Sequence, residues 1–227
     1  MNEKVLDERK VEELTLLIKK IVIAVVVLSV VGVLHLFIER SQERTEKDAF
    51  ALLFSAEKLE RELGEASNPF DPKFYESMAA WTPEVKQQYR ELLEQVVSKY
   101  PSAEAGHLAR LRLARVNIVD GNVSEAEELL AAVKSKASED FIKAHSLQLL
   151  GVIYENQNKL DDALSAFDQI VSLKKAPFKP LAMLSKARVL KALNRGDEAK
   201  SVYEKVTSDF PNTIYEKQAR ALMAIGS

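Results

Sequence analysis

The sequence predicts an all-α protein in which a single N-terminal transmembrane helix precedes a solenoid of helix-turn-helix repeats. Three observations predict this fold class. Gly and Pro are scarce, with 7 of each in 227 residues, and few runs alternate between apolar and polar residues as strands do. Residues 21–38 form an apolar run without a charged side chain. In the C-terminal half, small residues recur at a fixed interval, which indicates a repeated packing unit.

The charge balance and the absence of cysteine narrow the possible functions. The formal net charge is -2, so the chain lacks the basic stripe that is typical of nucleic-acid-binding proteins. Without Cys it has no disulfide framework, no thiolate metal site and no thiol nucleophile. The length suits one globular domain of ordinary size plus an appendage.

The run IVIAVVVLSVVGVLHLFI at residues 21–38 predicts a transmembrane helix. At a rise of 1.5 Å per residue, this run spans about 27 Å, close to the hydrocarbon thickness of a bilayer. Lys19 and Lys20 precede it, and Glu39 and Arg40 follow it. A cleaved signal peptide is the alternative, but no small-residue cleavage site follows the apolar run. We therefore expect an uncleaved membrane anchor.

The orientation of this helix is predicted from the flanking charges. Five Lys or Arg residues precede the run, and four lie in the twenty residues after it. This slight excess favours a cytoplasmic N-terminus. We expect residues 1–20 to form a short cytoplasmic tail and the C-terminal domain to lie on the outer face of the membrane.

Ser29, Gly32 and His35 are the small or polar residues within the apolar run. They are spaced three apart, so they share one face of a helix. Small and polar side chains allow a second membrane helix to approach closely, and this face is a candidate membrane contact face. The alternative is that Ser and Gly are simply common in membrane helices.

Three units in the C-terminal half share one spacing pattern. Each has a small residue, a second small residue twelve positions later and a bulky residue four positions after that: Ala114, Ala126 and Leu130; Gly151, Ala163 and Phe167; Ala187, Ala199 and Tyr203. The units follow one another at steps of 37 and 36 residues, and each is expected to form helix, polar turn and helix. Glycine inside a helix costs roughly 0.5–1 kcal/mol relative to Ala. We expect Gly151 to offset this cost by letting the two helices pack closely.

Residues 39–85 are expected to hold a divergent first helix, over 48–63, and an aromatic loop, over 67–85. The loop concentrates four aromatic residues: Phe70, Phe74, Tyr75 and Trp81. Asp71-Pro72 and Thr82-Pro83 each predict the start of a helix. The aromatic residues either cover the open end of the solenoid or bind a partner. Residues 86–227 are expected to contain the repeats and a capping helix at 214–225.

The second unit, with Gly151, Tyr154, Ala163 and Phe167, resembles the tetratricopeptide repeat pattern. The first and third units resemble it with departures, such as Asn117 at a position where an aromatic residue is usual. The resemblance implies a solenoid of stacked helix pairs whose first helices line a concave, protein-binding face.

The order of elements is similar to that of a bacterial family of single-span inner-membrane proteins with a periplasmic repeat domain. One membrane helix, a divergent helix pair and the stretch YPSAEAGHLARLRLA at residues 100–114 carry this resemblance. Members of that family are ancillary subunits of the Sec translocon that are linked to periplasmic chaperones. The resemblance implies a bacterial inner-membrane location, a periplasmic C-terminal domain, and partners among translocon subunits, chaperones or secreted clients.

Transferring the repeat pattern places nine residues on the concave face, which we call the groove set: Leu111, Arg115, Ile118, Gln148, Val152, Glu155, Leu184, Arg188 and Lys191. The set is apolar at its centre with charges around it. It does not match the Lys and Asn set by which repeats of the resembled family hold a C-terminal carboxylate, so we do not expect it to capture a C-terminal tail. A helix or an extended segment of a partner would suit such a groove.

No catalytic motif, phosphate-binding loop or metal-ligand spacing is present in the sequence. His107 and His145 could approach each other across stacked repeats and hold a metal, but ordinary structural histidines are the favoured interpretation. We therefore expect no enzyme, no catalytic residues, no cofactor and no small-molecule substrate. The hypothesis is a membrane-anchored protein-interaction module, an accessory subunit of the secretion machinery. The alternative is a structural scaffold in a cell-envelope assembly complex.

Overall fold

The computed structural model describes residues 2–63, 78–176 and 178–225 of the chain, and every regular element in these residues is an α-helix. The all-α fold class is therefore confirmed. The helices are α1 (Asn2–Glu62), α3 (Pro83–Lys99), α4 (Glu104–Val119), α5 (Val123–Lys136), α6 (Asp140–Asn156), α7 (Leu160–Ser172), α8 (Lys179–Ala192), α9 (Gly196–Asp209) and α10 (Ile214–Ile225).

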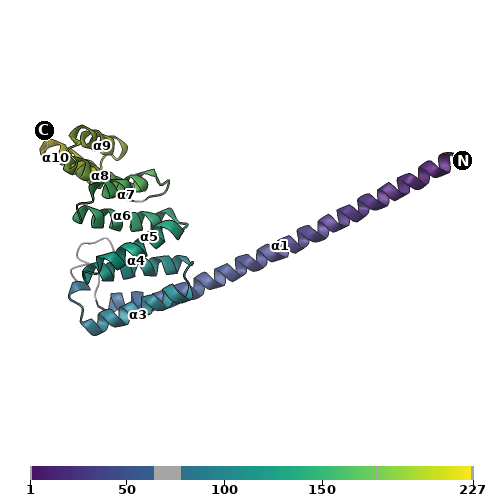
Figure 1. Cartoon of the computed structure of the whole chain (residues 1–227), viewed down its shortest axis with the longest axis horizontal. Coiled ribbons are helices and arrows are strands. Elements are labelled where there is room, and N and C mark those ends of the chain that lie inside the picture. The colour runs from purple at the N-terminus through teal and green to yellow at the C-terminus, as the bar shows by residue number, and fades with distance from the viewer. Residues whose placement is uncertain (1, 64–77, 177, 226–227) are drawn as a thin grey trace. The chain divides into compact units, whose positions relative to one another are not determined.

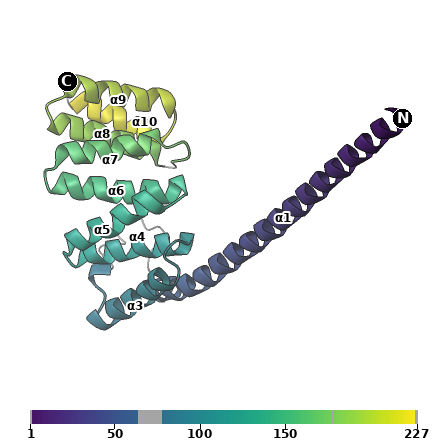
Figure 2. The same ribbon diagram turned by 45° about the vertical axis from the view of Figure 1, so that its right-hand side comes forward.

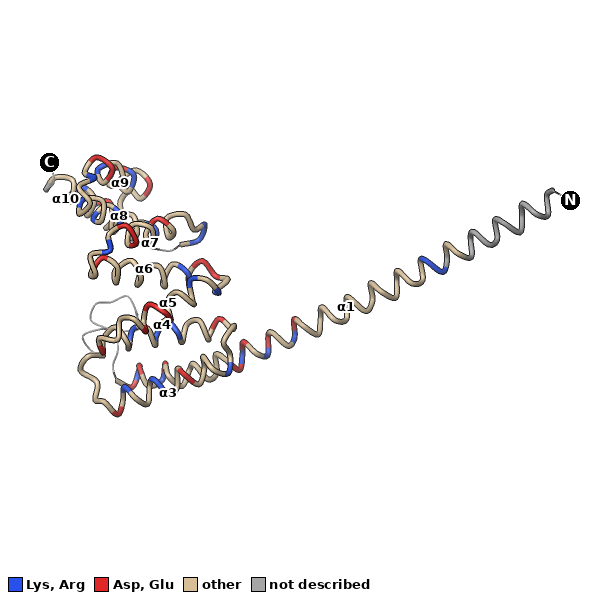
Figure 3. Tube along the Cα trace, viewed as in Figure 1, with Lys and Arg blue, Asp and Glu red and all other residues tan. Residues whose placement is uncertain are grey.

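The chain divides into two compact units, the first ending at Asp48 and the second beginning at Ala49. The first unit holds most of α1, including a long run without charged residues that is drawn in tan in Figure 3. An 18-residue window of this helix has a mean hydropathy of 3.0, so by length and composition it could cross a membrane. Its apolar side chains, such as Leu28 and Phe37, are exposed in the chain by itself. The boundaries predicted for the tail, the span and the later segments stay predictions.

The second unit is a solenoid in which each helix from α3 to α10 packs against the next one along the chain. Figures 1 and 2 both show α3 to α9 stacked in chain order. α4 also contacts α6, and α8 contacts α10, so the first helices of successive pairs are neighbours. Three apolar clusters follow one another along the unit, and each joins residues from several successive helices.

The turn inside each helix pair has the same geometry in all three units. Gly121, Asn158 and Asn194 have positive φ angles of 82°, 59° and 59°, and they follow the 37- and 36-residue steps of the repeat. After each of them, the next amide donates to a carbonyl five residues earlier, as Lys159 N does to Tyr154 O at 2.8 Å. This left-handed cap satisfies the free carbonyl groups at the end of the first helix.

Gly151 and Phe167 meet where α6 crosses α7. A Cβ atom at residue 151 would lie 2.6 Å from two ring carbons of Phe167, whose side chain is fully buried. Ala163 is also fully buried beside this contact. The close approach that the repeat predicted at Gly151 is therefore confirmed.

The beginning of α3 confirms one of the two predicted helix starts. Thr82 Oγ1 accepts a hydrogen bond from Val85 N at 3.4 Å, and Pro83 stands in the first turn. Trp81 is buried, and its ring packs edge-on against Tyr89 with the centroids 5.2 Å apart. Trp81 is thus part of the core at this end of the solenoid. The other predicted start, Asp71-Pro72, and the aromatic residues Phe70, Phe74 and Tyr75 lie outside the described residues.

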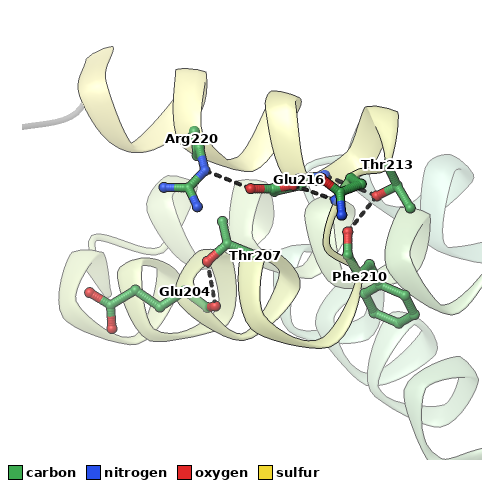
Figure 4. Close-up of polar contacts among 7 residues, drawn as sticks. Glu204, Thr207, Phe210, Thr213, Glu216 and Arg220 are labelled. Atoms are coloured by element: carbon green, nitrogen blue, oxygen red, sulfur yellow. Dashed lines mark hydrogen bonds and ion pairs between the residues drawn. The ribbon is translucent and has the colours of Figure 1, made fainter.

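α10 is the capping helix that the sequence predicts, and its first turn is fixed by Thr213 and Glu216 (Figure 4). Thr213 Oγ1 donates to Phe210 O at 2.7 Å and accepts from Glu216 N at 3.3 Å. The Glu216 carboxylate accepts from Asn212 N at 2.6 Å and from Arg220 Nε at 2.9 Å. This arrangement resembles a capping box and satisfies donors at the helix start. α10 packs against α8 and α9 and covers that end of the core.

Candidate functional site

The groove set lies on the first helices α4, α6 and α8, and its nine members differ in exposure. Leu111, Arg115 and Leu184 are buried. Ile118, Gln148 and Glu155 are partly buried, and Val152, Arg188 and Lys191 are exposed. Leu111 and Leu184 belong to the apolar core clusters. The surface available to a partner therefore comes from the other six residues and not from the two leucines or Arg115.

Val152 is the exposed apolar residue of this surface. Its exposed fraction is 39 %, whereas Leu150 and Ile153 beside it are buried. Gln148 lies one turn earlier on the same face of α6. Its Oε1 atom is buried and has no hydrogen-bond partner within the described part of the chain. Val152 is therefore the part of this face that a bound segment can contact, because the Gln148 oxygen is covered.

Glu155 and Arg188 join α6 to α8 on the same surface. Arg188 Nε donates to Glu155 Oε1 at 2.6 Å, and its Nη2 donates to Glu155 Oε2 at 2.8 Å. The hydrogen bond to Glu155 raises the pKa of Arg188. The Arg188 side chain is 56 % exposed, so we expect the pair to contribute little to stability. Its two-point geometry holds the guanidinium group in a fixed orientation on the surface.

His145 lies under this surface in an aromatic cluster. Its ring centroid is 4.4 Å from that of Phe141 and 4.6 Å from that of Phe178. Burial, together with the positive charges of Arg115 and Arg112, lowers the pKa of His145 to about 3. His145 is therefore neutral near pH 7 and acts as a packing residue. His107 is also buried.

No group of three or more His, Cys, Asp or Glu side chains that could hold a metal ion occurs in the part of the chain that the structure describes.

The contacts of the proposed membrane contact face, Ser29, Gly32 and His35, are local to α1 within the described residues. Ser29 Oγ donates to Val25 O at 2.8 Å, and His35 Nε2 lies 3.3 Å from Glu39 Oε1. A Cβ atom at Gly32 would meet nothing within 4 Å. Contact with another membrane helix stays a prediction.

A charged network that the sequence analysis missed links the end of α1 to α3 and α4. Arg112 Nη2 lies 2.7 Å from Glu57 Oε1, and Arg112 Nε lies 3.4 Å from Glu60 Oε1. The Tyr89 hydroxyl donates to Glu60. Burial and the charge of Glu60 raise the pKa of Tyr89 well above its usual value. No sequence signal marks these residues, because charged side chains at helical spacing do not identify their partners.

A second network joins α3 to α4 around Asn117. Arg90 Nη1 donates to Asn117 Oδ1 at 2.7 Å, and Arg90 Nη2 donates to Asp120 Oδ2 at 3.1 Å. Lys86 Nζ donates to Asp120 Oδ1 at 3.2 Å. The departure of Asn117 from the repeat pattern was the signal that could have located this network.

The comparisons with known proteins agree with this architecture. The tetratricopeptide repeat-like domain family matches residues 20–224 of the chain. A TPR repeat-containing protein of Methanocaldococcus jannaschii is 34% identical over 105 residues, which are 45% of this chain and 31% of the relative. An ancillary SecYEG translocon subunit of Neisseria gonorrhoeae is 31% identical over 119 residues, which are 52% of this chain and 56% of the relative.

The chain therefore spans less than two thirds of either relative. This chain is also similar to a solved structure of a kinesin light chain from Podosopora anserina, whose TPR-like repeats are nearly identical to one another. It is 22% identical, covers 74% of this chain and 92% of its own, and has a TM-score of 0.45.

Proposed function

The chain belongs to the tetratricopeptide repeat-like family, and on this premise we propose that it is a membrane-anchored protein-interaction module that serves the secretion machinery as an accessory subunit. The observation that carries the proposal is the surface of α6 and α8. An exposed apolar residue, Val152, lies near the Glu155–Arg188 pair, which is held by two hydrogen bonds. This combination suits a helix or an extended segment of a partner.

The assignment to secretion is supported by the relative named as an ancillary SecYEG translocon subunit and by the apolar part of α1. The partners would then be translocon subunits, chaperones or secreted clients. The location proposed is the bacterial inner membrane, with residues 1–20 in the cytoplasm and the repeat domain in the periplasm. A reporter enzyme fused after Ser227 tests the orientation. Activity only for a periplasmic reporter supports it, and activity only for a cytoplasmic reporter contradicts it.

The alternative function is a structural scaffold in a cell-envelope assembly complex. The two functions predict different complexes. An accessory subunit meets many clients briefly, whereas a scaffold holds one stoichiometric complex that survives mild detergent.

Purification of the full chain from native membranes in mild detergent distinguishes these functions. Recovery of translocon subunits, with several chaperones or clients in lower amount, supports the accessory role. Recovery of one other envelope complex in fixed stoichiometry supports the scaffold. Val152→Glu is the matched variant, because it places a charge on the exposed apolar contact and leaves the buried core unchanged. If the partners are recovered equally with Val152→Glu, they do not bind at this surface.

A further inference from the structure

A surface pocket lies apart from the groove set, between α3 and α5 and over α4. Its volume is about 480 Å³. Four apolar side chains contribute to its lining: Val97, Leu113, Leu129 and Ala132. The remaining lining residues are polar or charged: Arg90, Glu94, Asn117, Glu125 and Glu128. None of these residues belongs to the groove set.

Asn117 stands in this pocket at the repeat position where an aromatic side chain is usual. The equivalent residue of the next unit, Tyr154, is partly buried and packs against the apolar clusters on both sides. Asn117 is smaller and bonds to Arg90, which in turn is held by Asp120. The small side chain of Asn117 therefore leaves space between α3 and α5. The guanidinium group of Arg90, the only cation among the lining residues, is held by Asn117 and Asp120 of the same chain.

The pocket also carries three acidic side chains. Glu94, Glu125 and Glu128 are exposed and form no ion pair within the described residues. They come from two different helices, α3 and α5, both of which carry acidic segments drawn in red in Figure 3. They do not converge closely enough to form a metal-binding group in the described chain. An apolar lining beneath unpaired acidic groups is complementary to a long side chain with an apolar stem and a positive end.

We propose that this pocket binds an arginine or lysine side chain of a partner polypeptide, as a second interaction surface distinct from the groove set. The aliphatic part of that side chain packs against Val97, Leu113 and Leu129. Its charged end lies at the acidic rim formed by the carboxylates of Glu94, Glu125 and Glu128, without contacting all three at once. An exposed pocket of this kind contributes charge-dependent specificity more than raw affinity.

Methyl NMR of the full chain in detergent micelles tests this proposal, with Leu and Val methyl groups labelled. The probe is the blocked tripeptide Ala-Arg-Ala, and the matched probe replaces arginine by citrulline, which has nearly the same shape and no charge. The Arg probe is expected to shift the methyl signals of Val97, Leu113 and Leu129. The citrulline probe is expected to bind at least about tenfold more weakly. The affinity for the Arg probe is expected to fall as salt is added.

Two variants locate the site. The triple change Glu94→Gln, Glu125→Gln and Glu128→Gln is expected to weaken binding of the Arg probe about tenfold or more, whereas Glu204→Gln on α9 leaves it unchanged. Ala132→Phe fills the pocket without altering its charges and is expected to abolish the shifts. The carboxylates are exposed, so the triple variant keeps the fold, which the unchanged remaining methyl signals report.

Equal binding of the Arg and citrulline probes would overturn the proposal. So would unchanged binding in the triple variant or in Ala132→Phe, and so would the absence of shifts at Val97, Leu113 and Leu129.

Discussion

The two ends of the solenoid are held together by different interactions. From α6 to α9, small residues and aromatic rings alternate at the helix crossings, as Gly151 does with Phe167. Around α3 and α4, charged and polar groups join the helices, with Arg112 bonded to Glu57 and Glu60, and Arg90 bonded to Asn117. Both regions also have a buried apolar core, which around α3 and α4 includes Trp81 and Tyr89. A change of shape should therefore destabilise either end, whereas removal of a charged group should matter most around α3 and α4.

The largest effect is expected from Gly106→Ala at the polar end. A Cβ atom at residue 106 would lie 2.0 Å from the carbonyl oxygen of Tyr100. Because the neighbour is backbone, the turn before α4 must move, and we expect a loss of at least about 3 kcal/mol of unfolding free energy. Thermal unfolding of the full chain in detergent, followed by circular dichroism, measures it. Gly196→Ala is the control, because nothing lies within 4 Å of its Cβ position. Equal melting of both variants would contradict the account.

Arg112→Ala is expected to cost about 2–4 kcal/mol of unfolding free energy, because it leaves Glu60 and Tyr89 without their cation in a largely buried site. Arg188→Ala removes an arginine from an exposed pair and is expected to cost less than about 1 kcal/mol. The same thermal unfolding experiment compares the two. If Arg188→Ala were as destabilising as Arg112→Ala, the proposed difference between the ends would not exist.

Gly151→Ala tests the shape-dependent end. The new methyl group meets the buried ring of Phe167, so we expect a loss of about 1–2 kcal/mol of unfolding free energy. Phe167→Leu, which shortens the side chain, should partly relieve this clash. The double variant should then be more stable than the sum of the two single effects allows. Strict additivity in a double-mutant cycle would show that the two residues do not meet.

His145 makes stability depend on pH. Its folded pKa of about 3 lies below the unfolded value of about 6.5, so the unfolded chain binds the extra proton between these values. The contribution of neutral His145 to the unfolding free energy is fully present above about pH 6.5. Below that pH it falls by about 1.4 kcal/mol per pH unit. His145→Phe keeps a ring beside Phe141 and Phe178 and removes the titrating group. Melting temperatures from pH 7 to pH 5 should fall less steeply in this variant. Equal slopes would show that His145 does not set the dependence.

The sequence predicted the parts of the fold that rest on local periodicity. The apolar run of α1, the three helix pairs, the Gly151 crossing and the capping helix α10 all follow from spacing along the chain. The polar contacts of α3 and α4 could not be predicted, because Arg112 and Glu57 are far apart in sequence and nothing local marks them as partners. The close packing at Gly106 could not be predicted either. Gly106 is not at the small-residue position of the repeat, and the group that it approaches is the carbonyl oxygen of Tyr100 in the preceding turn.

The groove set shows a related limit of pattern transfer. The repeat pattern places Leu111, Arg115 and Leu184 on the same helix face as Val152, but it does not say how closely the neighbouring helices cover each position. Burial depends on how the pairs stack, and these three residues are covered. Val152 and Arg188 remain exposed on that face.

The most direct test of the proposed function places a photo-crosslinking residue at Val152 of the full chain in its native membrane. The matched position is Ser201, which is exposed on the second helix of the last pair. We predict protein adducts from residue 152, to translocon subunits, chaperones or secreted clients, and few from residue 201. Equal adducts from both positions would contradict the account. Adducts from residue 152 only to the chain's own α10 would mean that this surface is closed and that the partner binds elsewhere.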